Sequence, residues 1–544
     1  MSVGAAPRTT GEWRAARLYH AGLMPPPHPF ARLPSLAVAA GVLAGTARAQ
    51  DLQLETEPSR WRLSVVQGFT DGPDDLGAIG VHYQLGEPFP ALPNVHFGIG
   101  AYAGAWGDLG GWFASGFETG WRQPLAGGWT GEVGVFAGGA GAEVGDSGNG
   151  FFLRPHVALE RPLSRTWNWR VELAYGAQPG GDQDGVQIGV GVSAAREILT
   201  TDWSFAELLE LDDAELFAVP QRVDASIVHV DPSSGTGRTG RPAREFQLFA
   251  LRTHFAVGRD LYLPLEYASA VHGDAGGFRQ LAFGIGEWGP RFTPHVIGVK
   301  ELLVGAGGGS DYDTGGGFFA QANAGLEFPI ARGFSAHVKG GYQVSFDGDF
   351  DAWVVHVGAS YAPDYRELPR DFDRRRLSGE GLSSSDVELG EYIVSVKHKT
   401  VSPARAVLDA NGFPLDDAIH LAGVGLEREL MSGLDVLFNL FSAWEGDVGG
   451  YQEVQLGARY RLEVFRPWQT TGQFYVQYLA GSGSGDVDNP TGLLHEFGAG
   501  WRFSPSEGVW MAIEGAHAIA ESGTYEGDVL GLHVGWAFGR PRIR

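Results

Sequence analysis

Cysteine is absent from the 544 residues, so the chain has no disulfide framework, thiolate nucleophile or cysteine-ligated metal. Positive charge is scarce: 40 Lys and Arg stand against 64 Asp and Glu, a net charge of −24. That balance argues against nucleic acid or another polyanion as a partner. After residue 50 no run approaches the length of about 18 apolar residues that a transmembrane helix needs.

One apolar stretch, residues 33–46, lies near the N-terminus. It follows Arg32 and precedes Ala47-Arg48-Ala49, and this basic, apolar and A-x-A order predicts a signal peptide cleaved before Gln50. The first 23 residues are an unusual preface for a signal, so the start is either Met1 or Met24. We therefore expect an exported mature chain.

Glycine is plentiful, with 83 residues, which favours short turns and close-packed strands over helices. Residues 317–362 form a pattern of three strands and two turns, and residues 150–195 repeat it without a gap. About sixteen of roughly forty-six positions are identical, and a weaker third copy spans 492–538. This self-similarity predicts a protein of three repeats.

The strands alternate with a period of two. Trp353, Val355 and Val357 share one face of a strand, and His356 lies on the other. One apolar face per strand is typical of a half-buried β-strand. We predict an all-β, antiparallel, up-and-down fold of about 24 strands, about eight in each repeat.

The expected strands follow the hydrophobic pattern. In the first repeat they are 60–69, 77–85, 94–106, 111–123, 128–138, 150–163, 168–178 and 186–195. In the second they start near Asp224, Glu245, Leu261, Phe278, His295, Phe318, Phe334 and Trp353. In the third they start near Tyr392, Ile419, Leu434, Tyr451, Thr470, Leu493, Val509 and Val529.

The expected domain organisation has six parts: a leader and signal peptide (1–49), repeat 1 (50–197), a linker with a short acidic helix (198–222), repeat 2 (223–362), a polar linker (363–389) and repeat 3 (390–544). Connections alternate between tight turns and Gly/Asp-rich loops, as a meander with two different ends requires. An even strand count places both linkers at the end of the N-terminus, which makes the first a periplasmic linker if the sheet spans an outer membrane.

The apolar face could be covered by a second sheet or by lipid. Strands of about ten to fourteen residues match a tilted membrane crossing. Tryptophans near the strand ends are typical of the aromatic belts at membrane interfaces: Trp106, Trp112, Trp121, Trp129, Trp167 and Trp169. In lipid every backbone group must be paired, so the sheet is expected to close on itself.

The inward face is polar, which suits a barrel lumen and not the core of a sandwich. The predicted lumen network is Glu118, Arg122, Glu132, Arg154, Glu160, Arg170 and Glu172 in repeat 1, and Glu453, Arg459, Arg461 and Glu463 in repeat 3. The near-cancelling charges of repeat 1 favour a filled small barrel. Inward glycines argue the other way, because they would leave voids: Gly98, Gly100, Gly189 and Gly191.

These features resemble Gram-negative outer-membrane β-barrel proteins over most of residues 50–544. The last strand is similar to the aromatic-ended strand through which such proteins are recognised for insertion. Its alternating residues are Leu530, Leu532, Val534, Trp536 and Phe538. It departs from the family because GRPRIR follows the final aromatic residue. The resemblance implies an outer-membrane location. It also implies outer-membrane lipid and the barrel-assembly machinery as partners.

Closure is possible in two ways, with different functions. Three small barrels, which the charge balance favours, would be filled by their own side chains and would suit a structural, surface-binding or scaffold role. One merged barrel of about 24 strands would have a wide lumen and would suit a porin or an export channel.

A Gly-Asp-x-Gly-Gly-aromatic motif recurs once per repeat, at Asp108, Asp274 and Asp447. The motif could present a ligand-binding or catalytic carboxylate three times. Turn chemistry is the favoured interpretation, because Asp and Gly suit a tight loop and the aromatic would anchor the next strand at the membrane interface.

Two other groups of residues have the composition of a chemical site. Weak calcium candidates are the aligned D-x-D pairs Asp311, Asp313, Asp486 and Asp488, but no bidentate Glu stands at a fixed offset from them. A lipid or glycan hydrolase would need a nucleophile beside an oriented base. The inward histidines and serines are His156, His337, His356, His533, Ser193 and Ser360, and they match no known signature of such enzymes. No catalytic residue and no cofactor is expected.

Overall fold

The computed structural model describes residues 56–543 except the following segments: 71–75, 86–93, 108–110, 142–149, 165–166, 180, 182–183, 200–221, 236–241, 257–259, 274, 294, 311, 332–333, 362–386, 405–406, 410–411, 416, 432, 447, 449, 463–471, 486 and 507–508. The predicted signal peptide, the predicted acidic helix and nearly all of the polar linker therefore lie outside the described residues. Within the described part, no helix is long and apolar enough to cross a membrane.

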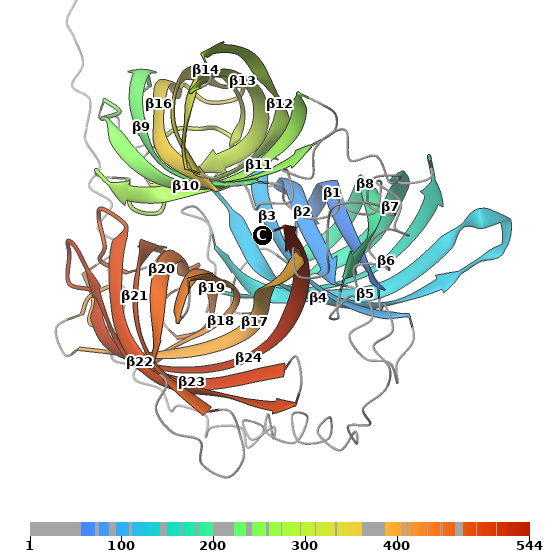
Figure 1. Ribbon diagram of the computed structural model, residues 1–544. Coiled ribbons are helices and arrows are strands. Elements are labelled where there is room, and N and C mark those ends of the chain that lie inside the picture. The colour runs from blue at the N-terminus through green and yellow to red at the C-terminus, as the bar shows by residue number, and fades with distance from the viewer. Residues whose placement is uncertain are drawn as a thin grey trace, which may run out of the picture. The chain divides into compact units, whose positions relative to one another are not determined.

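Twenty-four strands are described, and they form three closed antiparallel barrels (Figure 1). Barrel 1 consists of β1 (Thr56–Thr70), β2 (Leu76–Leu85), β3 (Val95–Gly107), β4 (Phe113–Pro124), β5 (Thr130–Gly141), β6 (Phe151–Pro162), β7 (Trp167–Gly176) and β8 (Gly185–Leu199). A short 3-10 turn, η1 (Ala126–Gly128), lies between β4 and β5.

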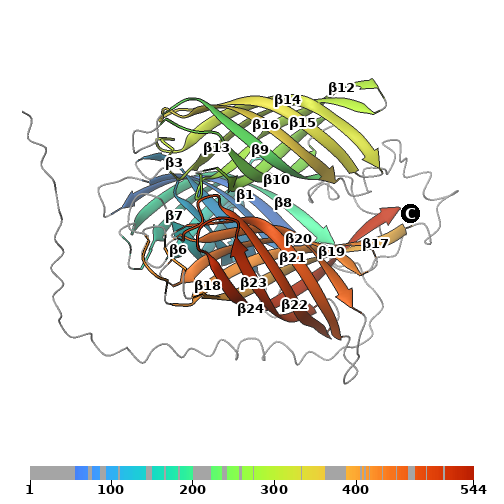
Figure 2. The same cartoon turned by 90° about the vertical axis from the view of Figure 1, so that its left-hand side faces the viewer.

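Barrel 2 consists of β9 (Arg222–Ser234), β10 (Phe246–Ala256), β11 (Leu261–His272), β12 (Arg279–Thr293), β13 (Val296–Gly308), β14 (Phe318–Ala331), β15 (Phe334–Ser345) and β16 (Asp351–Tyr361). Barrel 3 consists of β17 (Val387–Pro403), β18 (Ile419–Met431), β19 (Leu434–Glu445), β20 (Gln452–Leu462), β21 (Gly472–Ser484), β22 (Leu493–Ser506), β23 (Val509–Ala520) and β24 (Glu526–Ile543). Figure 2 shows β22, β23 and β24 of barrel 3 from the side.

Each barrel is closed by a ladder between its own first and last strands. Leu63 pairs with Val192 in barrel 1, Ile227 with Val357 in barrel 2, and Val396 with Val534 in barrel 3. The prediction of three eight-stranded barrels is confirmed, and the alternative of one merged barrel is wrong. The physical reason is that each repeat has enough strands to pair all of its own edges, and no edge remains to join the next repeat.

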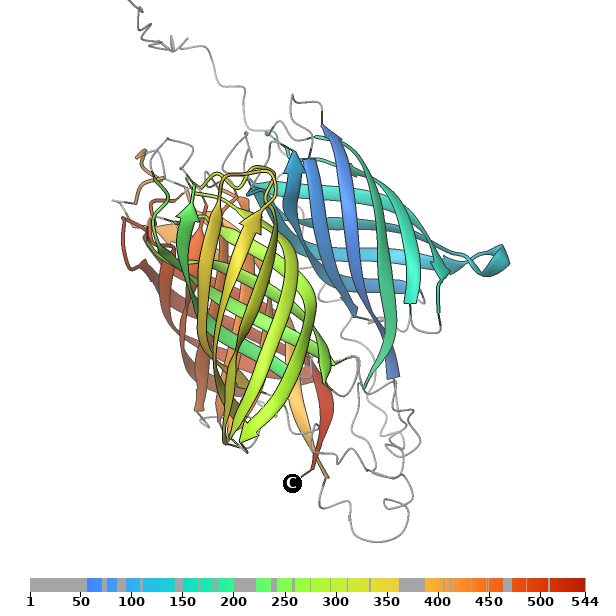
Figure 3. The same ribbon diagram turned by 90° about the horizontal axis from the view of Figure 1, so that it is seen from above.

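The polarity of each barrel is inverted relative to that of a soluble protein. Outward side chains are apolar and exposed, such as Val133 at 57% and Leu173 at 51%, whereas the inward Arg154 is buried. This is the alternation of a membrane-spanning barrel, with lipid-compatible residues outside and polar residues inside. The tilted strands of barrels 1 and 2 are visible from the side in Figure 3.

The two ends of a barrel differ. Connections after odd-numbered strands, which we call the loop end, include the longest connection within a barrel, residues 404–418 between β17 and β18. Connections after even-numbered strands, the turn end, include short ones such as residues 125–129 between β4 and β5, which contain η1. The chain enters and leaves every barrel at its turn end.

Candidate functional site in the barrel lumens

Ion pairs fill the turn-end half of the lumen of barrel 1, and in barrel 3 they also reach into the loop-end half. In barrel 1, Arg62 from β1 donates to both oxygens of Glu118 from β4, at 2.7 and 2.5 Å. Neither side chain is accessible to solvent. A two-pronged guanidinium–carboxylate contact is among the strongest polar contacts available to a protein and fixes both side chains. It therefore braces the barrel across its interior.

Arg170 is the second centre of this network. It contacts three carboxylates, those of Glu132 at 2.9 Å, Glu160 at 3.1 Å and Glu172 at 3.0 Å. Arg154 also pairs with Glu172, at 2.6 Å, and Arg122 pairs with Glu132, at 2.7 Å. The structure thus brings together all seven lumen residues that the sequence singled out in repeat 1.

The sequence interpretation missed three basic residues of this network, Arg60, Arg62 and His82. Arg60 pairs with Glu160, Arg62 with Glu118, and His82 with Glu118. The signal was present in β1, where Trp61, Leu63 and Val65 alternate with polar residues.

Barrel 2 carries a network that the sequence interpretation did not name. Arg252 pairs with Glu266 and Glu301, and Lys339 also reaches Glu301, at 2.9 Å. Asp224 lies 3.0 Å from His254. All of these side chains are buried, so each charge depends on its protein partner.

In barrel 3, Lys399 lies between Glu453 and Glu496, at 2.5 Å from each. The predicted Arg459 pairs with Glu427 at 2.7 Å and stacks over Tyr475, with 4.1 Å to the ring centroid. The remaining two predicted residues differ in outcome: Arg461 pairs with Glu429 and Asp435 near the turn end, and Glu463 lies outside the described residues.

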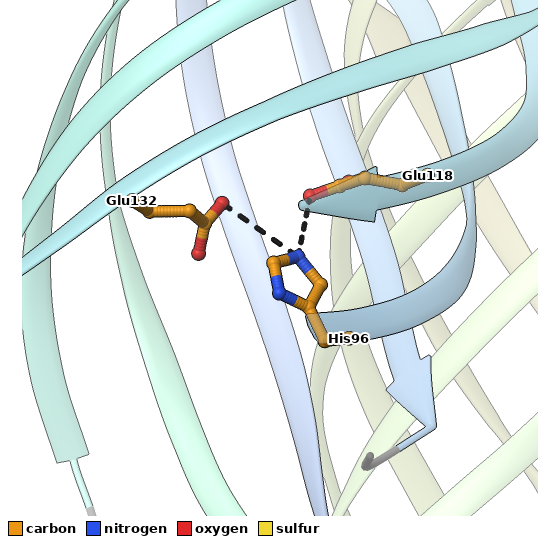
Figure 4. Close-up of side chains that lie close together, drawn as sticks. All are labelled: His96, Glu118 and Glu132. Carbon is orange, nitrogen blue, oxygen red and sulfur yellow. Dashed lines mark ion pairs between the residues drawn. The ribbon is translucent and has the colours of Figure 1, made fainter. Parts of the chain in front are cut away.

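One group in barrel 1 has the composition of a metal site. The Nε2 atom of His96 lies 3.8 Å from Glu118 and 3.9 Å from Glu132 (Figure 4). Both carboxylates are already bound by guanidinium groups, those of Arg62 and Arg170 among them. A divalent cation would have to displace these positive charges, so the geometry favours an ion-pair network and not a metal.

An apolar cluster closes the loop end of each lumen. Barrel 1 packs Phe136 edge-on against Tyr102 and Phe152, with ring centroids 5.3 and 6.1 Å apart. Barrel 2 gathers Phe246, Phe278, Tyr312 and Phe350, and barrel 3 gathers Phe441, Tyr451 and Tyr525. Such clusters resemble the core of a soluble protein. Because the outward side chains are apolar as well, the strand segments near the loop end carry apolar residues on both faces.

The inward glycines do not leave voids, and that expectation is wrong. A Cβ atom on Gly100 would lie 2.3 Å from the His82 ring, and one on Gly189 would lie 2.6 Å from the Glu172 side chain. These glycines make room for long polar side chains from neighbouring strands. The lumen is therefore filled by placing a long side chain on one strand beside a glycine on the neighbouring strand.

The Gly-Asp-x-Gly-Gly-aromatic loops share one geometry. Their first glycines have positive φ angles of 94°, 90° and 120°, and their last glycines have 83°, 96° and 71°: Gly107, Gly273 and Gly446, then Gly111, Gly277 and Gly450. Only glycine adopts these angles at low cost, which fits the turn interpretation. The three aspartates, Asp108, Asp274 and Asp447, lie outside the described residues.

The aromatic residue of this motif is not at the membrane interface, and that expectation is wrong. Trp112, Phe278 and Tyr451 are all buried in the apolar clusters of their own lumens. The reason is that the tight loop turns the next strand's first side chain inward, where it closes the loop end. Trp121 and Trp167, in contrast, are exposed on the outer surface, where a belt residue belongs.

The calcium candidates remain a hypothesis. Asp313 accepts a hydrogen bond from the backbone of Gly315 at 3.1 Å, as a turn-forming aspartate does. The backbone of Asp488 bonds to Leu408 and Thr524. Asp311 and Asp486 lie outside the described residues.

The six histidines and serines that a hydrolase would need lie inside the lumens. His337 Nδ1 lies 3.3 Å from Ser360 Oγ, but both residues are only 3% exposed and Arg222 also donates to this hydroxyl. His156 contacts Glu132, His533 contacts Glu514, and His356 contacts Gln321. Ser193 is buried as well. None of these side chains is open to a substrate as it stands.

Closed antiparallel barrels with lipid-compatible side chains outside and paired charges inside define an integral outer-membrane β-barrel protein of the Gram-negative type. No protein-family model matches the sequence, and no curated protein matches it.

Alignments to solved structures include OccAB3 of Acinetobacter baumannii, with 10% identity over 89% of this chain and 99% of that one and a TM-score of 0.22. They include the siderophore receptor PirA of Pseudomonas aeruginosa, with 8% identity over 91% and 81% and a TM-score of 0.27. The outer membrane protein opdK of Pseudomonas aeruginosa aligns with 9% identity over 90% and 100% and a TM-score of 0.22. At these scores the likeness carries no argument, and the class rests on the barrels themselves.

Proposed function

We propose that this protein is a non-conducting component of the outer membrane with a structural or scaffold role. The observation that carries the proposal is that each lumen is closed twice, by a layer of ion pairs and, nearer the loop end, by a layer of aromatic side chains. An eight-stranded barrel has room for little more than its own side chains.

Ion passage would have to open both layers. Arg62, Arg154 and Arg170 in barrel 1 and Arg459 in barrel 3 are among the largest fully buried side chains of the described residues. Breaking their pairs would leave charges without partners in a dry interior, which is strongly unfavourable. A steady open pore is therefore not expected.

Orientation follows from the two ends. Outer-membrane barrels have short periplasmic turns and longer extracellular loops, so we place the loop end at the cell surface and the turn end with both linkers in the periplasm. Outer-membrane lipid is the proposed partner of the outer faces, and the barrel-assembly machinery is the proposed partner of β24. In this proposal the protein is not an enzyme.

Conductance of the refolded protein in planar lipid bilayers tests the proposal. We expect a baseline without stable steps under conditions in which a porin control inserts and conducts. Folding is verified in parallel by the heat-modifiable gel migration of the same refolded protein after reconstitution into liposomes. Large, stable steps from correctly folded protein would overturn the non-conducting assignment and favour a channel.

A further inference from the structure

The third strand of every barrel contacts a neighbouring barrel, always in the same sense. β3 of barrel 1 lies against β13 and β14 of barrel 2, β11 of barrel 2 against β21 and β22 of barrel 3, and β19 of barrel 3 against β5 and β6 of barrel 1. In each case the third strand of one barrel contacts the fifth and sixth strands of the next barrel, and β19 also contacts the fourth strand, β4. This inference rests on the barrel fold and is independent of whether the lumens conduct.

A small residue lies at the centre of each contact, four positions before the first glycine of the Gly-Asp-x-Gly-Gly motif: Ala103, Ser269 and Ser442. Ser442 shares a hydrogen bond with Ser115 of barrel 1. Ser269 shares one with Ser482 of barrel 3 at 2.7 Å, and Ser482 donates another to the backbone of Ala270. Ala103 packs against barrel 2 in an apolar cluster with Leu281 and Ala306.

The motif glycines extend each contact at the loop end. The amide of Gly276 donates to the carbonyl of Pro490 in barrel 3 at 2.9 Å. A Cβ on Gly111 would lie 2.5 Å from Gly309 of barrel 2, and one on Gly450 would lie 2.6 Å from Gly141 of barrel 1. The backbones approach so closely that no side chain fits between them.

These outward positions differ from the rest of the outer face. Ala103, Ser269 and Ser442 are buried, whereas outward side chains such as Val133 and Leu173 are exposed. In a membrane, association gains nothing from removing apolar surface from water, so close packing of small residues and hydrogen bonds hold spanning elements together. The repeated small residues and glycines supply both.

We propose that each third strand, with its Gly-Asp-x-Gly-Gly loop, is a docking element whose partner is the fifth- and sixth-strand side of the next barrel. The contact runs from barrel 1 to barrel 2, from barrel 2 to barrel 3, and from barrel 3 to barrel 1. A head-to-tail contact of this kind closes when its rotation does, here after three copies. Barrels 3 and 1 are joined by no linker of the chain, so they are held together directly only through contacts between the barrels, of which those of β19 are the main ones and that of β24 with β8 is another.

A cleavable version of the full chain tests the proposal. Protease sites are inserted in the segments 198–222 and 363–389, the refolded protein is cut, and the particle is sized in mild detergent. We expect the three fragments to remain one particle. Separation into folded single barrels, each still heat-modifiable, would overturn the proposal, because the linkers alone would then hold the barrels.

Glycine variants test whether the assigned surfaces hold the barrels together. In the cleaved protein, the double variant Gly139→Leu, Gly316→Leu is expected to release barrel 1, because Cβ atoms there would lie 2.4 Å from the Ala443 carbonyl oxygen and 2.3 Å from the Trp106 Cα. The control is Gly340→Leu, since a Cβ at Gly340 meets nothing within 4 Å. An intact particle from the folded double variant would contradict the assigned surface.

A cross-link keeps the proposal testable if the double variant does not fold. Because the chain has no cysteine, the pair Ser115→Cys, Ser442→Cys introduces the only two thiols. Oxidation after cleavage is expected to join the barrel 1 and barrel 3 fragments. The control pair Leu173→Cys, Ser442→Cys uses a lipid-facing position and is expected to stay unlinked. Equal linking of both pairs, or of neither, would overturn the contact.

Discussion

The two halves of the lumen of barrel 1 are filled by side chains of opposite chemistry. At the turn end, barrel 1 is filled by pairs such as Arg170 with Glu132, whereas at the loop end it is filled by Phe136 and its aromatic neighbours. Both halves have the same outer surroundings, since apolar side chains face outward along the whole strand. The difference teaches that a barrel of this size needs a full lumen and not a polar one.

The two fillings fail differently when one residue is removed. A buried charge that loses its partner must be accommodated in a dry interior, so the cost falls on every group it was paired with. A lost aromatic ring leaves a cavity, and its cost depends on how far the neighbours can collapse. Substitutions in the two halves should therefore separate these mechanisms.

The largest effect is expected from Arg170→Leu. The change leaves three buried carboxylates without a shared partner, and losing one side of a buried pair costs about 3–5 kcal/mol, here at the upper end. The measurement is the denaturant midpoint of barrel 1, read from the protease-resistant fragment of that barrel in pulse proteolysis. The matched control is the exposed Arg161→Leu. An unchanged midpoint for Arg170→Leu would mean that the ion pairs do not brace the barrel.

Phe136→Ala is expected to have the next largest effect, because the ring is fully buried between Tyr102 and Phe152. Removing a buried phenylalanine ring costs about 3–4 kcal/mol. The same fragment assay measures it, and Phe136→Leu, which keeps most of the volume, should recover most of the loss. If the alanine and leucine variants are equally destabilised, packing is not what the loop-end half contributes.

Much of the fold could be predicted from the sequence. A period of two over ten or more residues fixes which side chains share a face, and the repeats give the strand count, so β18, β19 and β22 begin at the predicted residues. The charged half of the lumen was predictable in part for the same reason. Arg170 and Glu172 alternate with Val171 and Leu173, and the structure places them on opposite faces.

The rest could not be predicted, for two physical reasons. At the loop end both faces of a strand are apolar, so alternation loses its contrast, and Trp112 reads as an interface residue although it closes the lumen. The docking contacts join residues hundreds of positions apart, such as Ser115 and Ser442. A small residue in the sequence of one strand does not indicate which strand of another barrel it contacts.

The smallest effect is expected within the charged half itself, at its water-exposed mouth. Glu429 is 38% exposed and pairs with Arg461 at 2.6 Å, while Arg461 keeps a second partner in Asp435 at 3.1 Å. Glu429→Gln retains the oxygen that accepts from Gly433, so only the charge is removed. Exposed pairs contribute at most about 1 kcal/mol and are screened by salt, so the variant and the wild type should converge at high salt. Arg170→Leu should keep its full deficit there, because a dry pair is hardly screened. The comparison is made by fragment-resolved midpoints for barrels 3 and 1 at low and high salt. A deficit for Glu429→Gln that persists at high salt would place this mouth in the dry interior and move the boundary of the sealed lumen toward the turn end.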